Sequence, residues 1–220
     1  DFLSAKGLYI KEQISSNITG KQVNASRKVY LTKNYLLLTN STLPYKLLFN
    51  FKSGKVHLID DKNKRYSSTD INTIMNEEDK IISSVLYSVV DSKIHSRESG
   101  NKKMIKGYNC YEVVVYMPRI AAFTSLWLTN DIKTPLDLYF SILNRAEFKP
   151  GVKKIISILH NYNSYSVESV TTVLNPKGLP KYQKIKLEDI SYKEISVSYF
   201  TIPENYLNIP YNKEKRLGSF

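Results

Sequence analysis

Residues 46–59 read KLLFNFKSGKVHLI, and this stretch decides the fold. Leu47, Phe49 and Phe51 recur at every second residue, which is the side-chain period of a β-strand. Ser53-Gly54 follows as a two-residue turn of the kind that closes β-hairpins. The next five residues return with apolar side chains at the same period. The stretch therefore predicts an antiparallel hairpin that has one apolar face.

Short strand-like segments flank this hairpin on both sides. The turns between the early segments are too short for a parallel crossover, so the first third predicts an antiparallel meander. The expected strands are 8–16, 27–32, 35–39, 46–52, 55–59, 64–67, 104–109, 111–117, 125–129, 182–190 and 193–200. A polar loop is expected at 96–103, and 162–174 fits no single class.

Two amphipathic helices interrupt the strands. In Asn76–Asp91 three acidic residues come first and apolar residues follow at helical spacing. Pro135–Glu147 begins with Thr134 as the N-cap and Pro135 at the first helical position. A short third helix is expected over 152–159. Together with the strands, these helices indicate an α+β protein.

Composition limits the possible classes of protein. The chain has 220 residues, of which 42% are hydrophobic and 24% charged, so we expect one globular domain spanning 1–220. No apolar run reaches the roughly 18 residues of a membrane-spanning helix. The net charge of +12 comes from lysines spread along the chain, which favours a solvated surface over a nucleic-acid site. We therefore expect no nucleic-acid partner.

The residues nominate no catalytic or metal centre. Neither His57 with Asp60 nor His95 with Glu98 has the spacing of a zinc motif, and no glycine-rich phosphate loop or nucleophile elbow occurs. Cys110 is the single cysteine and is expected to be a buried strand residue. We therefore expect no enzyme activity, no cofactor and no metal.

About ten strands carry more apolar surface than one helix covers. Such a sheet must close, form a sandwich or curl around something. We therefore predict a curled antiparallel half-barrel of about ten strands with the two helices plugging its concave face. A loosely seated plug would leave a cavity for an apolar ligand, whereas a tight one would leave only a packed core. The expected lining is Leu36, Leu38, Leu47, Phe49, Phe51, Trp127, Tyr139, Phe140 and Leu143.

Several motifs, in this order, resemble a known bacterial family. The most specific are IKGYNCYEV at 105–113 and LWLTNDI at 126–132. LIDDKNKRY at 58–66 and FTIPENY at 200–206 are similar to a hairpin and to the closing segment of that family. The opening hairpin, from Tyr9 to Ile14 and Lys28 to Lys33, and the KGLP turn at 177–180 complete the set. The chain thus resembles envelope proteins with the LolA/LppX-like fold, in a subgroup of unknown function.

The resemblance implies a half-barrel capped by helices and exported to the periplasm. It implies a carrier that holds a lipid, an acyl chain or a lipoprotein in a hydrophobic concavity. We expect a periplasmic protein or one anchored on the periplasmic side of a membrane, with any signal peptide or lipid anchor outside this chain. The alternative is a non-catalytic scaffold that binds an envelope protein or makes peripheral contact with an anionic membrane surface.

Overall fold

The computed structural model describes residues 4–18, 20–74, 94–118, 121–132, 157–158, 160–174 and 178–212. Both predicted plug helices, Asn76–Asp91 and Pro135–Glu147, lie outside the described residues. Most of the predicted helix at 152–159 also lies outside them; its residues 157–158 are helical, and residues 160–162 beyond its end are helical too.

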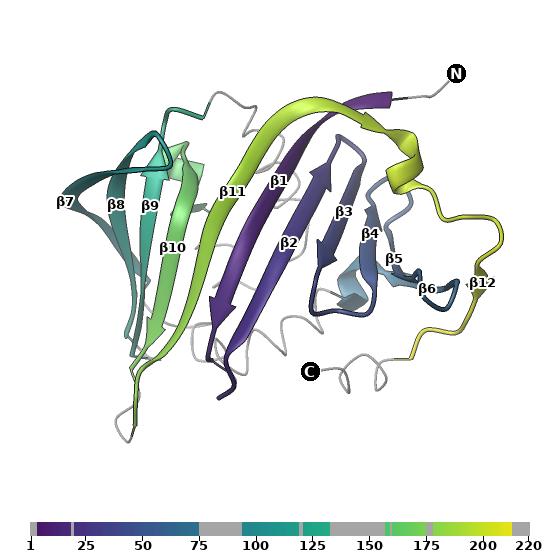
Figure 1. Cartoon of the computed structure of the whole chain (residues 1–220), viewed down its shortest axis with the longest axis horizontal. Helices are drawn as coiled ribbons and strands as arrows, with labels where there is room; N and C mark the ends of the chain where they lie inside the picture. The colour runs from purple at the N-terminus through teal and green to yellow at the C-terminus, as the bar shows by residue number, and fades with distance from the viewer. Residues whose placement is uncertain are drawn as a thin grey trace.

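The described chain forms one open, curled sheet of twelve strands (Figure 1). The spatial order is β12-β6-β5-β4-β3-β2-β1-β11-β10-β9-β8-β7, which leaves β12 and β7 at the two edges. Every pairing is antiparallel except that of β12 with β6. The strands are β1 (Ser4–Ser16), β2 (Val23–Leu31), β3 (Tyr35–Asn40), β4 (Lys46–Asn50), β5 (Lys55–Asp60), β6 (Arg65–Asp70), β7 (His95–Ile105), β8 (Tyr108–Met117), β9 (Ala122–Thr129), β10 (Tyr165–Val173), β11 (Lys181–Ser196) and β12 (Leu207–Asn208).

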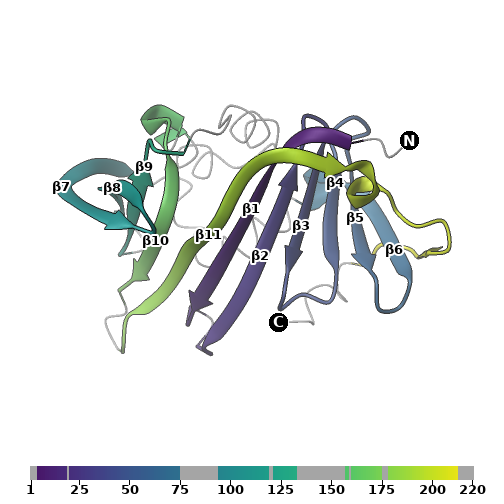
Figure 2. The ribbon, with the colours of Figure 1, turned by 45° about the horizontal axis from the view of Figure 1, so that its top comes forward.

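The sheet has two wings that are joined by β11. β1 to β6 form one wing and β7 to β10 the other, while β11 arches between β10 and β1 (Figures 1 and 2). β11 can do this because it is 16 residues long, with a bulge opposite Lys11 and Glu12. A bulge increases the local twist, so it bends the sheet at this point. The prediction of a large curled sheet is confirmed.

Five details of the prediction are wrong. The sheet has twelve strands instead of about ten, and one of its pairs is parallel. The polar loop expected at 96–103 belongs to β7, an edge strand whose exposure removes the apolar alternation that reveals a strand. The strands expected at 182–190 and 193–200 are one strand, β11, followed by the 3₁₀ turn η3 (Val197–Phe200). The strand expected at 104–109 contains the β7–β8 turn.

The first wing carries apolar side chains on both faces. Residues directly opposite each other in the register share a face. Leu8, Leu31, Leu36, Phe49 and Val56 form one such row across five strands, and we call this side the apolar face. The row on the other side is Tyr9, Tyr30, Leu37, Leu48 and His57.

A C-terminal strap (residues 197–208) covers part of that second side, which we call the strap face. Phe200 of η3 is buried with Leu37, Leu48 and Ile59, and it stacks on Tyr35 with the ring centroids 5.4 Å apart. The strap then follows the β6 edge, where the backbone N–H of Leu207 donates to the carbonyl of Lys64 at 2.9 Å. The second apolar cluster that the strap covers explains why both faces of β3, β4 and β5 are hydrophobic.

Candidate functional site

The structure brings together the predicted lining residues of β3 and β4. Leu36 lies opposite Phe49, and Leu38 lies opposite Leu47, so all four share the apolar face. Leu47 is buried, with 4% of its surface exposed, whereas Leu36, Leu38, Phe49 and Phe51 are partly buried. The rings of Phe49 and Phe51 lie 6.2 Å apart and nearly parallel. This patch, defined by these five residues, is the candidate apolar site.

Of the other predicted lining residues, only Trp127 is among the described residues, and it packs against the same buried cluster as Leu36 and Phe51. Trp127 lies on β9, with four strands between it and β3. Its partners in the register are Glu112 and Glu168, and the Lys103 ammonium lies 3.8 Å from the centre of its ring. Tyr139, Phe140 and Leu143 lie outside the described residues.

An ion pair between a buried carboxylate and a partly exposed guanidinium lies at the other end of the apolar face. The Glu12 side chain is on the same side of β1 as Leu8 and Ile10, and Glu12 is only 8% exposed. Nε of Arg27 donates to Glu12 Oε2 at 2.7 Å, and Nη2 lies 2.6 Å from the same oxygen. The Tyr165 hydroxyl donates to Oε1 at 3.3 Å. Because Tyr165 comes from β10, this network connects the two wings.

The strap face carries a groove that sequence reasoning missed. It consists of two adjoining pockets of about 360 and 590 Å³, which share Lys46, Ile59 and Asp61. One pocket lies under the strap, where it is lined by Leu37, Tyr199 and Tyr206. The other crosses β1 to β5, and its charged lining is Lys11, Lys28, Lys46, Lys62 and Asp61. The signal was present in the hairpin registers, because alternation places Lys11, Lys28 and Lys46 on one face.

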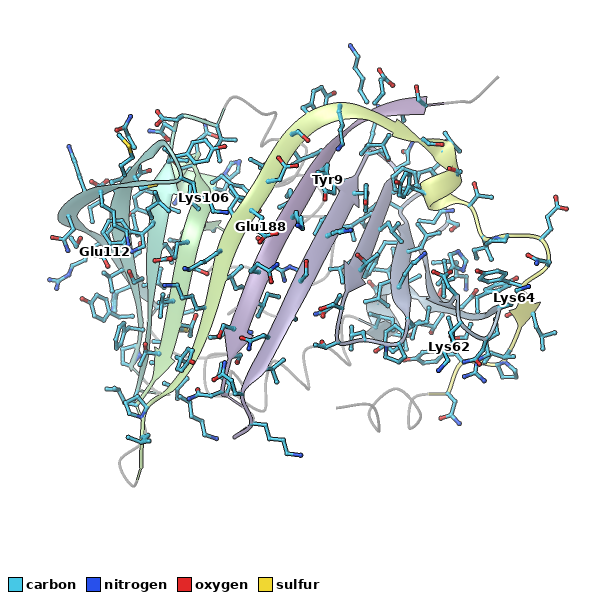
Figure 3. All side chains as sticks on the ribbon, viewed as in Figure 1. Tyr9, Lys62, Lys64, Lys106, Glu112 and Glu188 are labelled. Atoms are coloured by element: carbon cyan, nitrogen blue, oxygen red, sulfur yellow. The ribbon has the colours of Figure 1, made fainter. Side chains whose placement is uncertain are left out.

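Ion pairs and hydrogen bonds fix two of these lysines. Lys11 Nζ lies 2.7 Å from Glu188 Oε2, and this contact raises the pKa of Lys11 and lowers that of Glu188. Figure 3 labels Glu188 on β11 beside Tyr9 on β1. Lys46 pairs with Asp61, which also accepts a hydrogen bond of 3.1 Å from the Tyr206 hydroxyl. Asp61 thereby connects the groove to the strap.

Tyrosine rings border the same face. Tyr30 stacks on Tyr199 of the strap with the centroids 4.6 Å apart, and Tyr9 lies 5.0 Å from Tyr30. Burial, with Tyr199 and Tyr9 nearby, raises the pKa of Tyr30 to about 12. The Lys193 ammonium lies 4.1 Å from the centre of the Tyr9 ring. Burial raises the pKa of Tyr9 as well, so Tyr9 and Tyr30 stay neutral at physiological pH and do not offset the positive charge of this face.

The remaining candidate groups do not form a reactive centre in the described part of the chain. His57 is half-buried, its Nδ1 lies 2.7 Å from the Ser68 hydroxyl, and burial followed by the charge of Lys55 lowers its pKa. Cys110 is buried as predicted, and burial raises the pKa of its thiol, which disfavours the reactive thiolate. No group of three metal-ligating side chains occurs among the described residues. None of the helices described is long and apolar enough to cross a bilayer.

A second buried carboxylate, that of Glu168, allows a test of how much its ion pairs with lysine contribute to stability. It lies 3.0 Å from Lys184 Nζ and 3.4 Å from Lys103 Nζ. Burial raises its pKa, but the hydrogen bonds and charges of these lysines outweigh burial, so the pKa lies below the ordinary 4.5. A lowered pKa in the folded state contributes stability above about pH 4.5 that is lost as the pH falls through the folded value.

We therefore expect Glu168→Gln to cost about 1–3 kcal/mol of unfolding free energy at pH 7 and much less at pH 3. Urea unfolding at both pH values measures the difference. Glu98→Gln, at an exposed position of β7, is the control and is expected to change little at either pH. An equal cost of Glu168→Gln at pH 7 and pH 3 would contradict the assignment.

No protein-family model and no curated protein matches the sequence. Solved structures do match. Two crystal forms of PNGF-II share 15% identity with the chain and cover 98% of it at TM-scores of 0.41 and 0.44, and the chain spans about a third of their length. An uncharacterized conserved protein from Thermus thermophilus is 7% identical, with 93% of this chain and 90% of that chain covered at a TM-score of 0.49.

A LolA superfamily protein from Nitrosomonas europaea is also similar. It is 7% identical, with 89% of this chain and 90% of that chain covered at a TM-score of 0.33. The structures similar to this chain thus include members of the superfamily that its motifs resemble. Overlaps with TM-scores this low assign neither a ligand nor an activity, so the candidate sites stand on their own geometry.

Proposed function

We propose that this protein is a non-catalytic binding protein that holds a lipid or an acyl chain, free or on a lipoprotein, on the apolar face of its sheet. The proposed compartment is the periplasm or the periplasmic side of a membrane. The observation that carries the proposal is the patch of Leu36, Leu38, Leu47, Phe49 and Phe51, which is apolar throughout but only partly buried in four of its five members.

The affinity depends on how many methylenes of an acyl chain the patch removes from water. Each methylene removed from water contributes about 0.8 kcal/mol, so roughly ten methylenes correspond to a gross gain of about 8 kcal/mol. That value corresponds to a Kd near 1 μM before the cost of immobilising the chain is subtracted. An acyl chain lying across β3 and β4 can contact both leucines and both phenylalanines that are partly buried.

The competing explanation is a filled core, in which other parts of the same chain occupy the patch completely. The two explanations differ in one observable, which is whether a ligand can approach within contact distance of the Phe49 ring. The single tryptophan, Trp127, lies on β9 and can be replaced to leave an optically silent background.

We expect Phe49→Trp in a Trp127→Phe background to report ligand binding directly. A fatty acid brominated along its chain quenches a tryptophan that it touches, so fluorescence should fall by about half or more at saturation with a Kd in the micromolar range. The measurement is a fluorescence titration of detergent-free protein. Native mass spectrometry of the same protein then tests for an acyl ligand that co-purifies.

The matched control is Tyr66→Trp in the same background. Tyr66 lies on the strap face, opposite Ile59, so a ligand on the apolar face should leave it unquenched. Equal quenching of both reporters would indicate nonspecific partitioning. No quenching of the residue 49 reporter, together with no bound acyl species, would show that the patch is a filled core.

A further inference from the structure

We propose that the groove on the strap face binds an extended acidic peptide segment of a partner protein. This inference goes beyond the proposed function, because the groove and the apolar patch lie on opposite faces of the sheet. The groove is lined by four lysines, Lys11, Lys28, Lys46 and Lys62, and by one carboxylate, that of Asp61. Its own charge is therefore about +3 before the neighbouring Glu188 is included.

The lysines are arranged at a cost to the fold. Lys11 and Lys28 lie directly opposite each other on β1 and β2. Side chains in such a pair are about 5 Å apart at Cβ, and like charges there destabilise the sheet. Glu188 compensates Lys11, but Lys28 and Lys62 have no ion pair with any carboxylate in the described part of the chain. Two ammonium groups thus remain available to a ligand.

The spacing of the lysines indicates the shape of the ligand. Lys11, Lys28 and Lys46 are on β1, β2 and β4, and strands lie about 4.8 Å apart, so the row is roughly 14 Å long. A single phosphate or carboxylate cannot contact charges spread over that distance. An extended peptide can, because its side chains on one side recur about every 7 Å and so reach successive lysines.

The rest of the lining suits a peptide better than a membrane surface. Ser26, Thr39 and Asn40 offer polar groups to a backbone, while Leu43, Pro44 and Ile59 offer apolar contacts for side chains between the carboxylates. The strap borders the groove at Asp61, whose carboxylate accepts a hydrogen bond from the Tyr206 hydroxyl. This mixture of polar, apolar and basic groups along one row favours a single extended chain over a bilayer surface, which presents headgroups alone.

The test is the binding of a fluorescein-labelled peptide, SELESELESE, measured by anisotropy at low salt. We expect the double variant Lys28→Glu, Lys62→Glu to weaken binding at least about tenfold. The control, Lys21→Glu with Lys102→Glu, changes two exposed lysines outside the groove and lowers the net charge of +12 by the same amount. It should weaken binding less than about threefold, through long-range attraction alone.

Three results would overturn the proposal. One is equal weakening by both double variants, which would show that only net charge matters. Another is no saturable binding of the peptide by the unmodified protein. The third is that the peptide does not bind but vesicles containing phosphatidylglycerol do, with an affinity that depends on Lys28 and Lys62. That result would make the groove a membrane contact. Because the peptide assay involves only the strap face, its result is separable from the fate of the acyl-chain proposal, which concerns the opposite face.

Discussion

Gly7→Ala is expected to destabilise the protein by about 2–4 kcal/mol, and Gly7→Val is expected to prevent folding. A Cβ added at Gly7 would lie 2.4 Å from the carbonyl oxygen of Leu31 and 2.7 Å from Cδ1 of Ile195. The first of these atoms is backbone in the neighbouring strand β2, so it can retreat only if β1 and β2 separate. Chemical denaturation followed by circular dichroism measures the loss.

The matched control is Gly107→Ala, in the turn between β7 and β8. A Cβ there meets nothing within 4 Å, but the backbone has a φ of +82°, a conformation that residues with a side chain disfavour. Its cost should be about 1 kcal/mol, from backbone strain alone. An unfolding free energy of Gly7→Ala equal to that of Gly107→Ala would show that β1 and β2 adjust easily. The expected difference identifies Gly7 as a point where β1, β2 and β11 approach closely.

The parts of the fold predicted correctly are those whose information is local. The hairpin at 46–59 carries its alternation and its turn within a single short stretch, and the structure pairs Leu47 with Leu58 as the pattern requires. β7 is the opposite case. All of its residues from Arg97 to Met104 are exposed, so no apolar period marks it and its pairing with β8 depends on the tertiary fold.

The two candidate sites also differ in how far local sequence predicts them. The apolar patch was predictable because Leu36, Leu38, Leu47 and Phe49 alternate within two adjacent strands. Trp127 was grouped with them by its hydrophobic character, and the order of strands in space places it on β9, where it packs against the same core cluster as Leu36 and Phe51. The groove needed register and loop geometry together, since its lysines come from separate strands and Lys62 from a turn.

The second large effect is expected from Arg27→Met, at about 3–5 kcal/mol of unfolding free energy. Removing the guanidinium leaves the Glu12 carboxylate, which is 8% exposed, among the apolar residues Ile10 and Leu187 without its cation. A buried charge without a counterion costs far more than the lost attraction of a surface pair. The Tyr165 hydroxyl, at 3.3 Å, supplies one hydrogen bond and no charge.

The double variant Glu12→Gln, Arg27→Met tests the cause. It removes the charge together with its partner, so it should recover most of the stability lost by Arg27→Met, and the coupling energy should exceed about 1 kcal/mol.

The neighbouring pair of Lys11 and Glu188, also 2.7 Å long, provides a control whose carboxylate is more exposed: the Glu188 side chain is 27% exposed against 10% for Glu12, while Lys11 and Arg27 are similarly exposed, at 37% and 30%. Lys11→Met should cost no more than about 1 kcal/mol. If Arg27→Met cost no more than Lys11→Met, the Glu12 network would be a solvated ion pair. It would then not be the buried junction through which Tyr165 of β10 connects one wing of the sheet to the other.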